Sequence, residues 1–164
     1  MMRMFLKWLA HTNILLYAVS LIAINFAIKG CVHLFKYALS IPDIQFHERL
    51  IGKTLEITPN LAIDVLIIAP ILETLVFQTL FYMLLKRFKI QRHMVILCSG
   101  IAFGAIHNYS IFYMINAALM GFVFMLMYIL RSEAGSKPFV STAIAHSSIN
   151  LLALILAVIT RYHL

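Results

Sequence analysis

Three titratable side chains and one amide occur inside otherwise apolar stretches: Glu73, His107, His146 and Asn150. A desolvated carboxylate beside an imidazole can take a proton from water, and imidazole and amide N–H groups can stabilise a developing oxyanion. The residues therefore predict hydrolysis of a peptide bond by a water that Glu73 and His107 activate. His146 and Asn150 are the predicted donors to the oxyanion. The chain has no Gly-x-Ser-x-Gly motif, which disfavours a serine nucleophile.

The spacing of these residues is helical. Phe103 and His107 are four residues apart, as are His146 and Asn150, so each pair shares a helix face. Gly100 and Gly104 form a small-xxx-small pair that lets another helix approach closely. Each polar residue also has a structural interpretation, because a membrane-buried Glu or His can simply tie helices together by hydrogen bonds.

The surrounding composition predicts membrane-spanning helices. The 164-residue chain is 63% hydrophobic and only 12% charged, whereas about a quarter of a soluble domain is charged. We expect an all-α, polytopic transmembrane bundle of about five spans with a four-helix catalytic core, over residues 9–28, 61–85, 94–109, 111–130 and 139–160. Residues 1–60 would form an N-terminal helix with an interfacial or loop segment, and residues 61–164 the core. Residues 31–39 would be an interfacial helix or an extension of the first span.

Burial in lipid makes the polar residues informative. A charged carboxylate at the middle of a span costs at least about 2.5 to 3.5 kcal/mol on insertion scales. Three predicted spans each carry an ionisable residue that is costly to expose to lipid. The cost is lowest if Glu73, His107 and His146 converge on one internal cavity. Asp64 is nine residues from Glu73 and is predicted on the opposite helix face, near the interface.

The net charge of +7 does not indicate nucleic-acid binding, because Lys and Arg lie between the apolar runs. A cluster of four, Lys86, Arg87, Lys89 and Arg92, occupies one short connection. This distribution is typical of contact with the lipid bilayer and predicts a cytoplasmic N-terminus. The small size and short loops indicate a bacterial inner or plasma membrane. No pattern predicts an oligomeric state.

The order of the motifs resembles the CAAX protease and bacteriocin-processing family of glutamic-type intramembrane endopeptidases. The family's first motif is usually Glu-Glu-x-x-x-Arg, often preceded by Ala-Pro and with Phe before the Arg. This chain keeps Ala69, Pro70, the first Glu and Phe77, but has Thr74 for the second Glu and Gln78 for the Arg.

The resemblance implies a Glu73/His107 pair that activates water, His146 and Asn150 on the oxyanion side, and no cofactor or metal. It implies supporting positions at Phe103, Phe77, Thr74 and Gln78. The substrate would be a membrane-embedded or lipidated peptide or protein, such as a leader peptide, a lipidated tail or a sorting tail. Prenylated CAAX substrates are least favoured if the chain is bacterial.

Two other functions stay open. The replacements at Thr74 and Gln78 could mark a catalytically degenerate member that serves as a scaffold, immunity or partner-binding protein on the same fold. Glu73, His107 and His146 would also suit zinc in an enzyme or transporter. Zinc is less favoured, because each of these residues comes from a different predicted helix.

Overall fold

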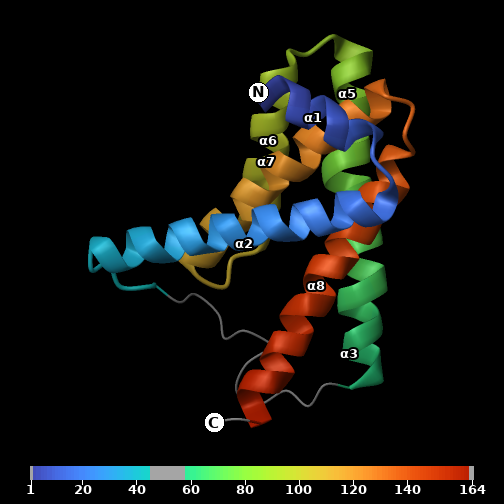
Figure 1. Cartoon of the computed structure of the whole chain (residues 1–164). Coiled ribbons are helices and arrows are strands. Elements are labelled where there is room, and N and C mark those ends of the chain that lie inside the picture. The colour runs from blue at the N-terminus through green and yellow to red at the C-terminus, as the bar shows by residue number, and fades with distance from the viewer. Residues whose placement is uncertain (1, 45–57, 163–164) are drawn as a thin grey trace.

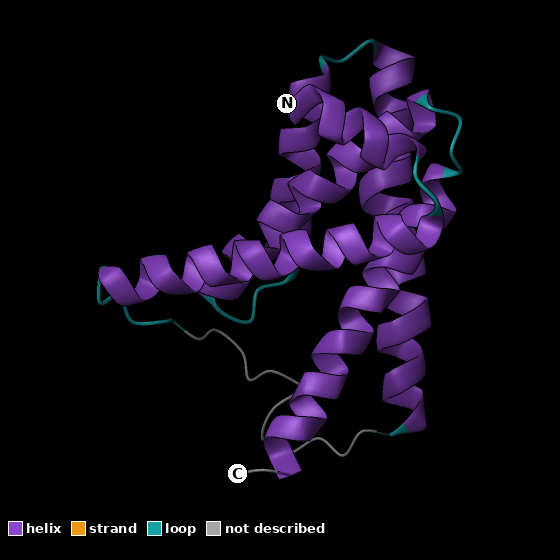
Figure 2. Ribbon diagram, viewed as in Figure 1, coloured by secondary structure: helices purple, strands orange, loops and turns teal. Residues whose placement is uncertain are grey.

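The described part of the chain is helical throughout. The structure is a computed structural model that describes residues 2–44 and 58–162, and Figure 2 shows no strand among them. Four helices are long and apolar enough to cross a membrane: Ile14–Ala38, Pro59–Phe88, Ile111–Glu133 and Pro138–Thr160. The predicted all-α polytopic bundle is confirmed. The predicted third span is a shorter apolar helix, Arg92–Ile106.

The N-terminal segment differs from the prediction of one span over residues 9–28. Helix α1 (Met2–His11) ends inside that range, and α2 (Ile14–Ala38) begins after a break. Asn13 makes the break because its side chain accepts a hydrogen bond from the backbone N–H of Leu16 and caps α2. Residues 31–38 continue α2, so this stretch extends the span. Residues 45–57 of the predicted loop lie outside the described residues.

The second span is one long helix with two π-helical segments. It consists of α3 (Pro59–Ile63), η1 (Asp64–Ile68), α4 (Ala69–Glu73), η2 (Thr74–Leu80) and α5 (Phe81–Phe88). A π-helical turn pairs residues five apart and so changes the direction in which later side chains point. Glu73 is the last residue of α4, directly between the two π-helical segments.

Helices α6 (Arg92–Ile106) and α7 (Ile111–Glu133) form a closely packed hairpin. A Cβ atom on Gly104 would lie 2.6 Å from the Cβ of Ala118 and 2.8 Å from the carbonyl oxygen of Met114. A Cβ on Gly121 of α7 would lie 2.9 Å from the Cα of Gly100. The predicted close approach at Gly100 and Gly104 is confirmed, and it fixes the turn that carries His107.

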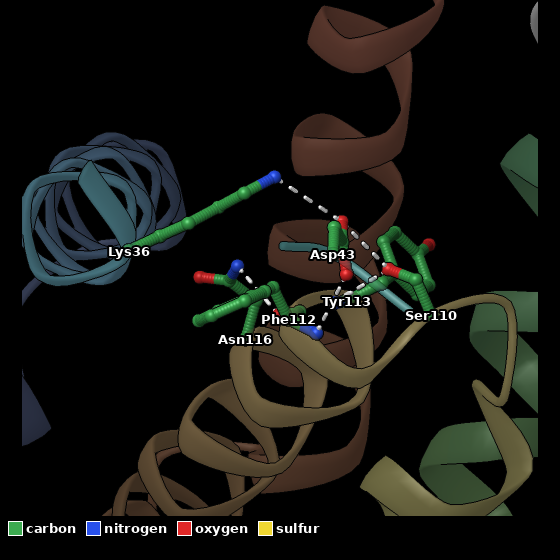
Figure 3. Close-up of polar contacts among 6 residues, drawn as sticks. All are labelled: Lys36, Asp43, Ser110, Phe112, Tyr113 and Asn116. Atoms are coloured by element: carbon green, nitrogen blue, oxygen red, sulfur yellow. Dashed lines mark hydrogen bonds and ion pairs between the residues drawn. The ribbon is translucent and has the colours of Figure 1, made fainter. Parts of the chain in front are cut away.

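Asp43, which follows α2, holds the start of α7 (Figure 3). Its carboxylate accepts hydrogen bonds from Ser110 Oγ at 3.1 Å and from the backbone N–H of Phe112 at 3.3 Å. Lys36 Nζ lies 3.7 Å from the same carboxylate. An acidic group at a helix N-terminus satisfies backbone donors and complements the helix dipole. This contact ties the end of α2 to the α6–α7 turn.

Helix α8 (Pro138–Tyr162) runs beside the Pro59–Phe88 helix, and α2 lies across it (Figure 1). Where they cross, the hydroxyls of Tyr17 and Thr142 share a hydrogen bond of 3.5 Å. The core between these helices and α7 contains Leu21, Phe124 and Ala145, all at most 2% exposed. The Pro59–Phe88 helix, by contrast, turns most of its apolar surface outward, as a lipid-facing helix does.

Candidate active site

One cavity of about 390 Å³ lies between α2, the Pro59–Phe88 helix, the α6–α7 hairpin and α8. Glu73, His107, His146 and Asn150 all line it. These residues come from two separate helices and one turn, and the fold places them around a single space. Asp64 is exposed and does not line the cavity.

Glu73 is the carboxylate at the centre of the cavity. Its Oε2 atom lies 3.6 Å from His146 Nε2 and 3.8 Å from His107 Nε2. Both distances exceed that of a direct hydrogen bond. Among the described residues, buried Oε2 has no hydrogen-bond partner. Both imidazoles thus face one carboxylate oxygen at a separation that suits a small bridging molecule.

His107 is held in place by the end of α6. The helix stops at Ile106, and His107 is its C-cap residue with φ −91° and ψ 45°. Its Nδ1 lies 2.7 Å from the carbonyl oxygen of Phe103. A carbonyl can only accept, so Nδ1 carries the proton, and the neutral ring presents Nε2 as an acceptor toward Glu73. The Phe103 ring, 4.5 Å away between centroids, fixes the ring plane.

His146 is almost completely enclosed. It is 6% exposed and lies against two aromatic rings, with centroid distances of 5.1 Å to Phe124 and 5.7 Å to Phe103. Its Nδ1 has no hydrogen-bond partner among the described residues. Its Nε2 lies 3.6 Å from Glu73 Oε2.

Asn150 lies one turn after His146 and also lines the cavity. Its Nδ2 donates a hydrogen bond of 2.9 Å to the backbone carbonyl of Val65 in η1. The amide group is therefore fixed by the helix that carries Glu73.

The four predicted supporting residues lie in two places. Phe103 lines the cavity and is 3% exposed, and Phe77 meets its ring edge-on at 5.5 Å. Thr74 and Gln78 lie behind Glu73 in η2, are fully buried, and do not line the cavity. Thr74 Oγ1 and both polar atoms of Gln78 have no hydrogen-bond partner among the described residues.

Sequence reasoning missed the wall of the cavity formed by α2 and α7. Asn25 and Lys29 of α2 line it, together with Tyr109, Tyr113 and Asn116. The signal was present, because Asn25 and Asn116 are isolated amides in apolar spans, and burying an amide also costs free energy, although less than burying a charge.

The geometry suits proton transfer at one point in an apolar, enclosed site. A carboxylate and a neutral imidazole acceptor face each other across 3.8 Å, and a second imidazole and an amide adjoin them. Within the described segments, no group of three or more His, Cys, Asp or Glu residues is arranged to hold a metal ion.

Comparison with known proteins gives one match. Residues 56–152 match the family described as Type II CAAX prenyl endopeptidase Rce1-like. This stretch is more than half of the chain and contains Glu73, His107, His146 and Asn150. No curated protein and no solved structure matches the chain.

Proposed function

This chain belongs to the Rce1-like family of type II CAAX prenyl endopeptidases, and from that premise we propose that it is a glutamic-type intramembrane endopeptidase. The family consists of proteases, and the chain is an integral membrane protein with four helices able to span the bilayer. In the proposed reaction, a water activated by Glu73 and His107 hydrolyses a peptide bond of a substrate delivered from the membrane.

The observation that carries this proposal is the separation between Glu73 Oε2 and His107 Nε2, 3.8 Å. Both atoms accept hydrogen bonds, so a water molecule can donate one proton to each. As the water oxygen bonds to the scissile carbonyl carbon, Glu73 takes one of its protons. The same proton then passes to the leaving amine as the C–N bond breaks. No covalent enzyme intermediate forms, and the atoms of one water are divided between the two products.

The oxyanion of the tetrahedral intermediate needs donors that are fixed before the reaction. His146 lies next to Glu73 and is clamped by two aromatic rings, so an N–H at its Nε2 can donate without rearrangement. Asn150 is held one turn away and has a second amide N–H beyond the one that Val65 accepts. We assign both residues to the oxyanion side of the site.

The substrate we propose is a membrane-embedded or lipidated peptide or protein, such as a leader peptide, a lipidated tail or a sorting tail. The cavity is lined by both apolar and polar side chains. Apolar Leu61, Ala153 and Ala157 line its α3 and α8 walls. Such a cavity accepts an apolar chain from the bilayer and holds the scissile amide near Glu73.

We also propose that the N-terminus faces the cytoplasm, in a bacterial inner or plasma membrane. Helix α1 lies at the same end of the bundle as the α5–α6 connection and the α7–α8 loop (Figure 1). Lys86, Arg87, Lys89 and Lys137 lie at this end, and positive charge in short connections favours the cytoplasmic side. Proteolysis of loops in oriented vesicles tests the orientation separately from the reaction.

The competing function is a non-catalytic membrane scaffold. The observation that favours it is that the buried side chains of Thr74 and Gln78, which replace the family's usual Glu and Arg, have no hydrogen-bond partner among the described residues. The two functions differ in whether Glu73 is needed. Zinc is the other alternative and predicts inactivation by chelator.

The test uses the purified chain in liposomes with a panel of lipidated and leader-type peptides. Glu73→Gln keeps the shape of the side chain but removes the base, and we expect cleavage to fall about 10³-fold. His33→Gln, at an exposed site outside the cavity, is the matched control and should cleave like wild type. Undiminished activity in Glu73→Gln would refute the glutamic mechanism. Loss of wild-type activity in chelator, restored by zinc, would replace it with metal catalysis.

A further inference from the structure

The π-helical segment before Glu73 leaves one backbone carbonyl without its helical donor. In η1 the N–H of Ala69 donates to the carbonyl of Asp64, five residues earlier. The next carbonyl in that register is Val65, and its donor would be the nitrogen of residue 70. Residue 70 is proline, which has no N–H. The π-helical register and the proline together leave the Val65 carbonyl without a backbone N–H donor from its own helix, and we call such a carbonyl open.

Asn150 of α8 fills this position. Its Nδ2 donates to the Val65 carbonyl oxygen at 2.9 Å, across 85 positions of sequence. Both residues line the cavity that contains Glu73, whereas Pro70 is fully buried behind it. An open carbonyl in an apolar interior is costly, so the Val65 carbonyl and the Asn150 amide hold each other firmly.

The side-chain amide of Asn150 has two N–H groups, and the Val65 carbonyl accepts only one of them. Fixing the first N–H restricts rotation of the amide and so fixes the direction of the second. A donor that is oriented before the reaction stabilises a developing charge better than one that must reorient.

We propose that Pro70 and the Val65 carbonyl are positioning groups: Pro70 keeps the carbonyl open, and the carbonyl orients the Asn150 amide toward the reacting atoms. This inference rests on the proposed function for the role of Asn150, but the contact itself does not depend on catalysis. It gives Pro70 a role in kcat rather than in substrate binding.

Pro70→Ala tests the inference, because alanine restores an N–H that competes with Asn150 for the Val65 carbonyl. We expect kcat to fall about tenfold with little change in KM, as for other partners that orient a catalytic group. Pro59→Ala is the matched control. Pro59 stands in the first turn of α3, where an added N–H has no helical acceptor, so activity should be unchanged.

The double variant distinguishes two roles of the Asn150–Val65 contact: orienting the Asn150 amide for catalysis, or only supplying a donor to the Val65 carbonyl. Asn150→Ala should lower kcat about 100-fold, and Pro70→Ala/Asn150→Ala should match Asn150→Ala, because no amide is left to orient. If Pro70→Ala instead restores activity to Asn150→Ala, Asn150 only satisfies the carbonyl and the inference is wrong. Effects that multiply would also overturn it, since the two residues would then act independently.

A second measurement needs no activity. Val65–Leu66 is the only Val–Leu step in the sequence, so valine labelled with ¹³C at the carbonyl and ¹⁵N-leucine give one coupled NMR signal. We expect Asn150→Ala to move the Val65 carbonyl signal upfield, and to move it much less when Pro70→Ala is already present. An unmoved signal in Asn150→Ala would overturn the contact. Glu73→Gln should leave the signal unchanged, so failure of the protease proposal is seen separately in the cleavage assay.

Discussion

Two of the regions in which the described residues bury polar groups differ in how those groups are hydrogen-bonded. Arg131 at the end of α7 is 3% exposed, and its guanidinium donates to the carbonyls of Ser136, Thr12 and Leu9 at 3.1, 3.1 and 3.3 Å. It also lies 4.5 Å from the centre of the Tyr17 ring. In the cavity, Glu73 Oε2 and His146 Nδ1 are buried without a hydrogen-bond partner among the described residues.

The comparison separates polar groups that stabilise the fold from polar groups that line the candidate active site. The Arg131 cluster joins the α1–α2 break to the α7–α8 loop through three hydrogen bonds to backbone carbonyls. Glu73 Oε2 and His146 Nδ1 in the cavity lack hydrogen-bond partners among the described residues, and under the proposed function the reactants are their partners. Buried polar groups without partners in a native fold are uncommon and are expected at functional sites. Substitutions in the Arg131 cluster should therefore change stability, and substitutions in the cavity should change activity.

The largest expected effect on stability comes from introducing a charge at a buried site outside both regions. Thr74→Glu buries a carboxylate in η2 without a partner and should destabilise the protein by about 3 kcal/mol. Adding Gln78→Arg, four residues later, should recover much of that loss, because the two side chains can pair along the helix. Unfolding in mixed micelles measures both variants. A double variant less stable than Thr74→Glu would contradict the pairing.

Removing the satisfied charge should have the next largest effect. Arg131→Met keeps much of the side-chain volume but leaves three carbonyls without a donor, and we expect a loss of about 2 kcal/mol in the free energy of unfolding. The folded fraction should cleave substrate at the wild-type rate. Tyr17→Phe is the milder companion, since it removes only the long hydrogen bond to Thr142. A folded but inactive Arg131→Met would contradict the view that the Arg131 cluster serves stability and not activity.

A steric change in the α6–α7 hairpin should affect both properties. Gly104→Ala places a methyl group 2.6 Å from Ala118 Cβ, so the helices must separate, at a cost of about 1 to 2 kcal/mol. His107 lies one turn further on, and cleavage should fall with stability. Gly30→Ala is the control, because a Cβ at Gly30 meets nothing within 4 Å. Equal behaviour of the two variants would show that the close approach is not needed.

The smallest expected effect on stability belongs to the residue with the largest expected effect on activity. Glu73→Gln removes a carboxylate whose Oε2 accepts no hydrogen bond from the described residues, so stability should stay within about 0.5 kcal/mol of wild type or rise slightly. Thermal unfolding in detergent measures this beside the cleavage assay. A marked loss of stability would show that Glu73, like Arg131, stabilises the fold.

The sequence predicted what depends on composition and on the cost of burial. The helical membrane bundle, the family resemblance and the contact face at Gly100 and Gly104 all follow from local patterns. The convergence of Glu73, His107 and His146 was predicted because each is expensive in lipid. These roles stay predictions until the variants are measured.

Other features depend on register or on distant contacts, and the sequence could not supply them. The Asn13 break shifted the first span, since one capping residue inside an apolar run outweighs the hydropathy pattern. The π-helical segments around Glu73 leave no periodic signal in a uniformly apolar helix. The Asp43 cap of α7 joins positions 67 and 69 residues apart, and the Val65–Asn150 bond joins positions 85 apart.

The shortness of α6 has a consequence for the surrounding bilayer. Its 15 residues extend for only about 22 Å, against a hydrocarbon thickness of about 30 Å. The α6–α7 turn, which carries His107, then ends below the level that a full span would reach. Hydrophobic mismatch of this kind thins the membrane locally and draws water and headgroups inward. The hydrolytic water would enter from that depression, while the apolar part of a substrate arrives sideways from the lipid.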